Sequence, residues 1–501
     1  MRMRSRPAIR LGLSLVLVLT AAAWLPAQNF DALKGKVRTH VLPNGMKWIV
    51  LERHEAPVAS FHVYADVGSA NESYGITGIS HILEHMAFKG TKTVGTTDYA
   101  RESKVLAELD SAYAALKAEQ AKPKPDPERV QVLQKTFDDL EARAKSFVVN
   151  NECVDLLLQQ GDTGLNAYTN FDATQYISSL PSNRLEFWMS LTSDRFFHPV
   201  FREFYKERSV IQEERRLGIE TQPVGRLVED FLAAAFKASP YHHHVIGHMA
   251  DLQSITRRDV EAYFQKFYSP SNLTVAVVGD VRPEEVFRLA DLYFGRIPSG
   301  PRPEPIRTVE PEQWGERRVT VVAMSMPVLL IGYHRPPAAH ADNEALNALA
   351  NILGQGRSSR LHVSLVKDKK AAVVVQGLNG FPGQKQASLI AFLAASTPGR
   401  TSEECLKLID EEIALVKKDS VTADELTKYK RTAIKGILDQ MQGNAGLAAL
   451  LTDADAVFGD WRYAFDRIAA INAVTADDVK RAAETYLVRT QRVIGEIVMS
   501  Q

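Results

Sequence analysis

The sequence predicts an α+β fold of two similar domains, each a mainly antiparallel sheet packed with helices, which a proline-rich linker joins. Three observations lead to this prediction. Short strand-like stretches alternate with amphipathic helical patterns along the chain. Proline, which interrupts helices and central strands, occupies four of the eight positions from Pro298 to Pro305. A threonine, a helical pattern, an aromatic residue and a strand follow in the same order from Thr256 and again from Thr475, 219 positions later. This repeat indicates a duplication, although Thr is a common helix cap and a chance recurrence is the alternative.

The first domain is expected to begin with a β-hairpin. Two stretches of alternating apolar and polar residues flank Pro43-Asn44-Gly45, and Asn-Gly is the strongest short signal for a tight hairpin turn. Long helices of the second domain are predicted to begin near Asp342 and Ser402. The predicted strands are Val37 to Leu42, Met46 to Glu52, Val58 to Ala65, Leu273 to Val278, Val319 to Val322, Val328 to Tyr333 and Val493 to Val498.

The domain boundaries follow from these patterns. We expect a first domain over residues 28–297, a linker over 298–315 and a second domain over 316–501. Residues 101–147 are highly charged and look like an insert of two amphipathic helices that meet at a turn rich in lysine and proline. This helical hairpin is either a docking arm or lid or, by the simpler interpretation, a solvated surface element.

The N-terminal residues 1–27 resemble a secretory signal peptide. Four arginines precede an apolar stretch from Leu11 to Leu25, and a small residue, Ala27, marks the expected cleavage site. The apolar stretch is shorter than the roughly 20 residues that a membrane span needs, although retention as an anchor is the alternative. We therefore expect a periplasmic or secreted protein without a stable membrane span after cleavage.

The composition excludes several classes of protein. A chain of 501 residues that is 45% hydrophobic and 24% charged is neither disordered nor of low complexity. Its 60 basic and 60 acidic residues balance, so there is no electrostatic basis for nucleic-acid binding. With two cysteines, Cys153 and Cys405, any metal has to be held by histidine and carboxylate, and we expect both thiols to be free and buried.

The most informative pattern is His81-Ile82-Leu83-Glu84-His85. On a helix, His81 and His85 lie one turn apart on the same face, so both imidazoles can reach one metal ion. Glu84 lies on nearly the same face and is placed to hold a water on that ion. The simpler interpretation is two core histidines beside a surface glutamate, but chance rarely produces His-x-x-Glu-His in a chain with 13 histidines.

A catalytic zinc ion needs one more protein ligand than these two histidines. Glu207 and Glu214 lie seven positions apart, two turns along one face of a predicted helix. Such a glutamate pair is common on solvated helices, so spacing alone does not identify a ligand.

Together these stretches resemble the insulinase/pitrilysin family of zinc metallopeptidases, in the branch with short bacterial and processing-peptidase-like chains and an inverted zinc motif. The resemblance covers most of positions 37 to 500. It rests on His81 to Thr91, Leu165 to Thr169, Glu207 to Val210 with Glu214, Pro240 to Gly247 and Gly354 to Leu361.

The resemblance implies an exported Zn²⁺-dependent endopeptidase that hydrolyses peptides or unfolded segments. Residues 28–297 would form its zinc-binding peptidase domain, and 316–501 a second domain of the same family without zinc. Asn166 and Ala167 would lie on an edge strand along which the substrate peptide binds. The implied site residues are the zinc ligands His81, His85 and Glu214, the general base Glu84, the auxiliary acid Glu207, and the substrate-binding Phe88, Asn166 and Ala167.

The sequence departs from the family pattern in two places. The charged insert places Glu214 129 positions after His85, which an insertion in a loop permits. Val366 and Val373 occupy the places of an arginine and a tyrosine that contact substrate in the family's second domain. We therefore expect a related zinc-free subunit that carries this pair, and otherwise a homodimer. The alternative function is that of a non-catalytic partner or scaffold subunit in a peptidase complex.

Overall fold

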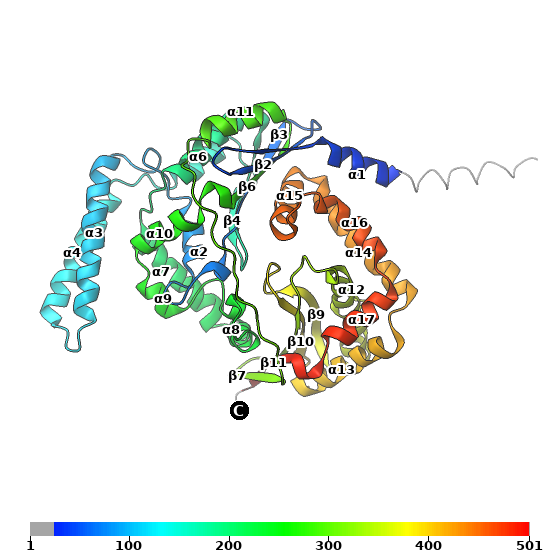
Figure 1. Cartoon of the computed structure of the whole chain (residues 1–501). Coiled ribbons are helices and arrows are strands. Elements are labelled where there is room, and N and C mark those ends of the chain that lie inside the picture. Colours follow the sequence, from blue (N-terminus) through cyan, green and yellow to red (C-terminus); the bar gives the residue numbers. More distant parts are fainter. Residues whose placement is uncertain (1–24, 500–501) are drawn as a thin grey trace, which may run out of the picture.

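The fold was obtained as a computed structural model, which describes residues 25–499. The predicted signal peptide lies outside these residues except for its last three, which begin α1 (Leu25–Lys36). Two sheets with helices packed around them form the molecule, which confirms the predicted α+β class (Figure 1). Helices α3, α4, α8, α10, α15 and α17 are described below. The other α-helices are α2 (Ile79–Met86), α5 (Glu152–Gln159), α6 (Leu185–Phe197), α7 (Phe204–Arg215), α9 (Met249–Ser254), α11 (Pro283–Tyr293), α12 (Asn343–Gly354), α13 (Ser402–Asp419), α14 (Ala423–Gln442) and α16 (Tyr463–Ala473).

The first sheet has six strands in the order β1-β2-β6-β3-β5-β4. Every neighbouring pair is antiparallel except β2 and β6. The predicted hairpin is present as β1 and β2, which pair from Val37 with Leu51 to Val41 with Lys47. The strands are β1 (Val37–Val41), β2 (Lys47–Glu52), β3 (Val58–Ala65), β4 (Asn166–Thr169), β5 (Thr174–Pro181) and β6 (Leu273–Gly279).

The second sheet repeats the topology of the first. Its order is β7-β11-β8-β10-β9, and only β7 and β11 are parallel. Without β1, the order of the first sheet is β2-β6-β3-β5-β4, which has the same arrangement as the second sheet. In this match β2 corresponds to β7, and the edge strand β4 corresponds to the edge strand β9. The strands are β7 (Arg317–Ala323), β8 (Val328–Arg335), β9 (Ala372–Phe381), β10 (Ser388–Ser396) and β11 (Arg492–Met499).

The repeat around Thr256 and Thr475 is a pair of equivalent capped helices. Thr256 caps α10 (Arg257–Phe267) and Thr475 caps α17 (Ala476–Tyr486). In both, the threonine hydroxyl and the aspartate three residues later bond to each other's backbone N–H, which is a capping box. The matching caps and the matching strand order together support the predicted duplication.

Each half of the chain covers the sheet of the other half. Helix α8 (Pro223–Ala235), from the first half, packs on β7 and β11, and its Phe231 is fully buried there. Helix α15 (Asn444–Phe458), from the second half, packs on β3 and β6. This exchange of helices gives the two halves shared apolar cores, so they form one unit.

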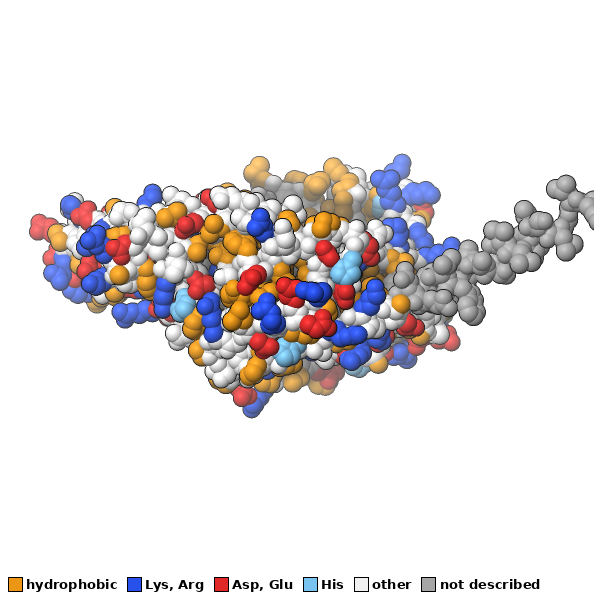
Figure 2. All heavy atoms as spheres, turned by 90° about the horizontal axis from the view of Figure 1, so that it is seen from above, with side chains coloured by type: hydrophobic (Ala, Val, Ile, Leu, Met, Phe, Trp, Pro, Cys, Tyr) orange, Lys and Arg blue, Asp and Glu red, His pale blue; other side chains and the backbone are white. Residues whose placement is uncertain are grey.

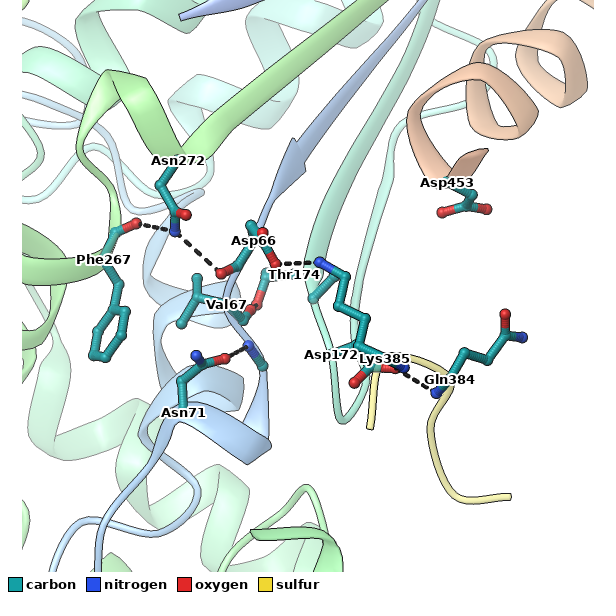
Figure 3. A network of polar contacts seen from close by, with 12 residues as sticks. Asp66, Val67, Asn71, Asp172, Thr174, Phe267, Asn272, Gln384, Lys385 and Asp453 are labelled. Atoms are coloured by element: carbon teal, nitrogen blue, oxygen red, sulfur yellow. Dashed lines mark hydrogen bonds and ion pairs between the residues drawn. The ribbon is translucent and has the colours of Figure 1, made fainter. Parts of the chain in front are cut away.

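Polar contacts add to the joint between the halves. The loop between β9 and β10 reaches the first sheet, where Lys385 pairs with Asp66 and the Gln384 backbone N–H donates to Asp172 at 2.7 Å (Figure 3). Between Tyr293 and Arg317, within the proline-rich segment and its flanks, the described chain forms no helix or strand.

The charged insert forms a helical hairpin. Helices α3 (Tyr99–Gln120) and α4 (Pro127–Lys145) protrude from the first half on the side opposite the second sheet (Figure 1). Acidic and basic side chains are interspersed over the face that Figure 2 shows, including the protruding end. Cys153 and Cys405 are buried, unpaired thiols, as predicted.

Within residues 25–499, no helix combines the length and the apolar character needed to cross a membrane.

Candidate zinc centre

Helix α2 carries the His-x-x-Glu-His pattern. It begins after Gly78, whose φ of 90° suits glycine, and the Glu72 carboxylate accepts hydrogen bonds from the N–H groups of Gly78 and Ser80 at 2.7 and 2.8 Å. The apolar side chains of this helix are buried in the core of the first half. His81 and His85 therefore turn away from the core, partly exposed, with ring centroids 4.8 Å apart.

Helix α7 brings Glu214 to the two histidines. Helix α7 packs against α2, and Glu214 lies beside the face of α7 that buries Phe204, Ile211 and Arg215, so its carboxylate reaches α2. The Glu214 Oε2 atom lies 3.9 Å from His81 Nε2 and 3.8 Å from His85 Nε2. The structure thus brings Glu214 to two histidines that lie more than a hundred positions earlier in the sequence.

These three donors fit a zinc ion. One ligand atom from each residue lies within 4.8 Å of the other two, so the three side chains can converge on one ion. Burial, with the neighbouring histidines, lowers the pKa of His81 to about 4, so its imidazole is neutral and keeps a lone pair for a metal. Two imidazoles and one carboxylate leave a fourth position open, as catalytic zinc sites do.

Glu84 lies beside this group without belonging to it. Its carboxylate accepts a hydrogen bond from the Thr169 hydroxyl at 2.7 Å, which ties it to β4. Burial raises the pKa of Glu84 above its ordinary value, although the Thr169 bond and the charge of His85 oppose this. A carboxylate whose pKa is raised toward neutrality suits proton transfer.

Glu207 contacts the Nδ1 side of the His85 ring. Its Oε2 lies 3.5 Å from His85 Nδ1, and its Oε1 accepts from Lys89 Nζ at 2.5 Å. The hydrogen bond to His85, with the Lys89 ammonium, lowers the pKa of Glu207 to about 2. A carboxylate on Nδ1 fixes the tautomer in which Nε2 faces the metal position.

A cavity of about 390 Å³ opens beside Glu84, His85 and Glu207. Phe88, Asn166 and Ala167 also line it, so the structure places the sequence-predicted substrate residues on the same cavity. The Phe88 ring is covered by the Arg195 guanidinium, 4.6 Å from its centroid. Strand β4 forms the edge of its sheet and pairs only with β5 among the described strands, which leaves its other side available to an extended peptide.

Val366 and Val373, which stand where the family pattern has an arginine and a tyrosine, lie in the second half of the chain. Val366 belongs to a π-helical segment (His362–Asp368) and packs against the core there. Val373 lies on the edge strand β9, with 44% of its surface exposed. Neither side chain can donate a hydrogen bond.

Three contributors to this site carried no assigned role in the sequence analysis. Thr169 and Lys89 bind Glu84 and Glu207, and Glu72 holds the start of α2. Lys89 and Thr169 stand inside the stretches that match the family, which is the signal that could have found them. No periodicity marks Glu72, because its partners are backbone N–H groups.

Comparisons with known proteins show similarity to a family of peptidases. The family model described as "Insulinase (Peptidase family M16)" matches residues 48–118, and the model described as "Peptidase M16 inactive domain" matches residues 254–433. Among curated proteins, the zinc protease PqqE of Helicobacter pylori is 27% identical over 489 residues, which cover 96% of this chain and 96% of that protein. A probable mitochondrial-processing peptidase subunit beta of Arabidopsis thaliana is 22% identical, over 92% of this chain and 78% of that protein.

Solved structures show the same fold. A protease from Helicobacter pylori superimposes with a TM-score of 0.77 at 26% identity, over 92% of this chain and 99% of that one. A peptidase M16 inactive domain from Pseudomonas fluorescens gives a TM-score of 0.71 at 18% identity, over 93% and 98%. The periplasmic protease PqqL from Escherichia coli gives 0.66 at 17% identity, over 92% of this chain and 47% of that one.

Proposed function

The chain belongs to the insulinase family of peptidases, peptidase family M16, and from this we propose that it is an exported zinc-dependent endopeptidase that hydrolyses peptides or unfolded segments. The observation that carries the proposal is the convergence of His81, His85 and Glu214 next to Glu84 and an open edge strand. Relatives named zinc proteases support the same metal.

In this proposal His81, His85 and Glu214 hold the zinc ion. A zinc ion held there would supply Lewis-acid chemistry, which would lower the pKa of a bound water toward about 7 and polarise the scissile carbonyl. Glu84 takes the proton of the attacking water and passes it to the leaving amine. Glu207 keeps His85 oriented, and Thr169 keeps Glu84 oriented.

The substrate binds as an added strand on β4. Main-chain groups of Asn166 and Ala167 pair with an extended peptide, which suits peptides and unfolded segments better than folded proteins. Phe88 supplies apolar contact beside the bond that is cleaved.

We further propose that this chain is the catalytic subunit of a two-subunit complex, with a related zinc-free subunit that supplies the missing arginine and tyrosine. Hydrogen-bond donors to a developing oxyanion contribute on the order of 10²–10³ in rate, and valine supplies none. PqqL supports pairing of such units, because this chain matches about half of it. A homodimer or monomer with other donors is the alternative.

The partner proposal predicts a chain that binds zinc but cleaves slowly alone. Adding a related subunit that has arginine and tyrosine at these two positions should raise kcat by about 10²-fold. The measurement is hydrolysis of a quenched fluorescent peptide library by the purified chain with and without that subunit. Full activity from the single polypeptide would refute the two-subunit proposal.

The alternative of a non-catalytic scaffold subunit is less well supported. The family model with "inactive" in its description matches residues 254–433, a range that contains none of His81, Glu84, His85 and Glu214. This match therefore lies mostly in the second half and leaves the four residues of the proposed zinc site outside it.

The decisive variant is Glu84→Gln. Because Glu84 is not a proposed ligand, this variant should retain one zinc per chain while kcat falls by about 10² or more. Metal content measured by atomic emission, together with peptide hydrolysis, separates the two effects. A wild-type chain that neither contains zinc nor gains activity with it would favour the scaffold role.

Export and a periplasmic or secreted location complete the proposal. They rest on the signal-peptide pattern of residues 1–27, and fractionation of cells that express the full chain tests them. The N-terminal sequence of the exported form should begin after Ala27. An uncleaved chain in the membrane fraction would favour the anchor.

A further inference from the structure

Arg202 is almost completely buried, yet every N–H of its guanidinium has an acceptor. It is 1% exposed. Nε and Nη2 donate to the two carboxylate oxygens of Glu102 at 2.8 and 3.1 Å. The remaining donors bind the backbone carbonyls of Lys89, Thr91 and Val94 at 2.6, 2.7 and 3.1 Å. Five donors with five acceptors make this a fixed junction.

The carboxylate of this junction comes from the inserted hairpin. Glu102 lies in the first turn of α3 and has no exposed surface. Breaking such a buried pair leaves an uncompensated charge, so each partner depends strongly on the other. The hairpin thereby supplies the counter-charge for a residue outside it.

The three carbonyls belong to the loop that follows the zinc helix α2. This loop, Lys89 to Gly95, wraps closely around the guanidinium. A Cβ atom added to Gly90 or to Gly95 would lie 2.8 Å from Arg202 Nη1, so only glycine fits at both positions. The place of the loop is therefore set by Arg202.

The loop and Arg202 both lead directly to the zinc centre. Lys89, whose carbonyl binds Arg202, donates its Nζ to Glu207, and Glu207 contacts His85. Two residues after Arg202, α7 begins, and it carries Glu207 and Glu214. One junction thus holds the loop behind His85 and the start of the helix that supplies the third ligand.

A second contact ties the hairpin to α7. Asp110 of α3 accepts from the Tyr205 hydroxyl at 3.1 Å and pairs with Arg257 at 2.6 Å. Tyr205 is the second residue of α7 and is buried against the hairpin aromatics Tyr113 and Phe137.

We propose that Arg202 and Glu102 are positioning residues of the zinc centre. Through this pair the inserted hairpin holds Lys89, Glu207 and Glu214 in the positions that metal binding requires. The inference rests on the proposed function for its metal. It gives the insert a role in the site that neither a lid nor a solvated arm would have.

The test separates positioning from folding stability. Glu102→Leu with Arg202→Met removes both buried charges together, a replacement that is often neutral for stability. We expect the double variant to keep its melting temperature within a few degrees but to bind zinc about 10- to 100-fold more weakly. Arg202→Lys, which keeps a charge for Glu102 but loses the fork to the loop carbonyls, should weaken zinc in the same direction.

Two further readouts report geometry directly. The visible spectrum of the Co²⁺-substituted chain should change in both variants, because the ligand geometry changes. kcat should fall more than KM changes, because the peptide strand β4 is not part of the junction. The matched control is Arg143→Gln, which removes the exposed pair with Glu108 on the same hairpin and should leave every readout unchanged.

Unchanged zinc affinity and cobalt spectra in the double variant and in Arg202→Lys would overturn the inference, as would an equal effect of Arg143→Gln. If the wild-type chain bound no zinc, the proposed function would fail instead. In that case, hydrogen exchange of residues 85–95 and 204–215 in the metal-free chain tests whether Arg202 and Glu102 position these segments. Faster exchange in the variants supports the inference, and equal exchange overturns it.

Discussion

Glu213 and Glu214 are neighbours on α7 with different surroundings. Glu214 faces the two histidines, whereas Glu213 pairs with Arg216 on the exposed side. Glu214→Ala should therefore lower zinc affinity by several orders of magnitude, because two histidines alone hold zinc weakly. Competition with a chromogenic chelator measures this.

Glu213→Ala is the control for that prediction. It removes an equal charge one position away and should leave zinc affinity within about twofold, as expected for an exposed pair. An equal loss of zinc affinity in both variants would mean that the negative charge near the site causes the effect and that Glu214 is not a ligand.

The site residues differ in how far the sequence alone could find them. His81 and His85 are i and i+4 on one helix, so their convergence is a property of local geometry. Glu214 meets them only because α7 folds against α2, and its spacing with Glu207 is also that of an ordinary solvated helix. Only the resemblance to the family singled it out beforehand.

At the scale of elements, the zinc helix depends on an acidic cap from outside it. Glu72 accepts hydrogen bonds from the Gly78 and Ser80 N–H groups at the start of α2, and burial raises the pKa of its carboxyl group to about 8. Glu72→Ala leaves these donors without a partner. We expect a loss of about 1–2 kcal/mol in the free energy of unfolding and a lower zinc affinity.

Urea unfolding and zinc titration of Glu72→Ala test this expectation. Glu55→Ala provides the comparison, since Glu55 lies on the surface with 72% of its side chain exposed and should change neither quantity. A fully stable Glu72→Ala chain would show that other contacts hold the start of α2.

Strands and capped helices were largely predictable. The predicted strand Val58 to Ala65 has the observed bounds, and both threonine caps are where the repeat placed them. Their signals are short-range, since they depend on alternation within a strand or on a cap and its third neighbour. The exchange of α8 and α15 between the sheets was not predictable, because an apolar helix face does not specify which sheet it will cover.

At the scale of the whole molecule, the joint between the halves contains a buried histidine. His62 of β3 is 1% exposed, faces α15, and its Nδ1 lies 2.6 Å from the Thr452 hydroxyl. Burial lowers the pKa of His62 from 6.5 to about 4. Between these values the unfolded chain binds more protons at this position than the folded chain.

Stability should therefore decrease as the pH falls from about 6.5 to 4. The part due to His62 is on the order of 3 kcal/mol. Urea unfolding at pH 7.5 and pH 5 measures the decrease, which should be smaller in His62→Gln. His40→Gln, at a histidine whose side chain is 35% exposed, should keep the wild-type difference. The same pH dependence in His62→Gln as in the wild type would contradict this account.

By itself, the sequence determined the α+β class, the duplicated order of strands and capped helices, and the two histidines with their glutamate. These features depend on periodicity, caps and turns, which act over a few residues. Tertiary structure alone decided that Glu214 lies against the two histidines, that Thr169 and Lys89 bind Glu84 and Glu207, and that Glu102 of the insert pairs with the buried Arg202. Such contacts join segments about 80 to more than 100 positions apart, and no local pattern specifies which buried polar groups will find one another when the chain packs.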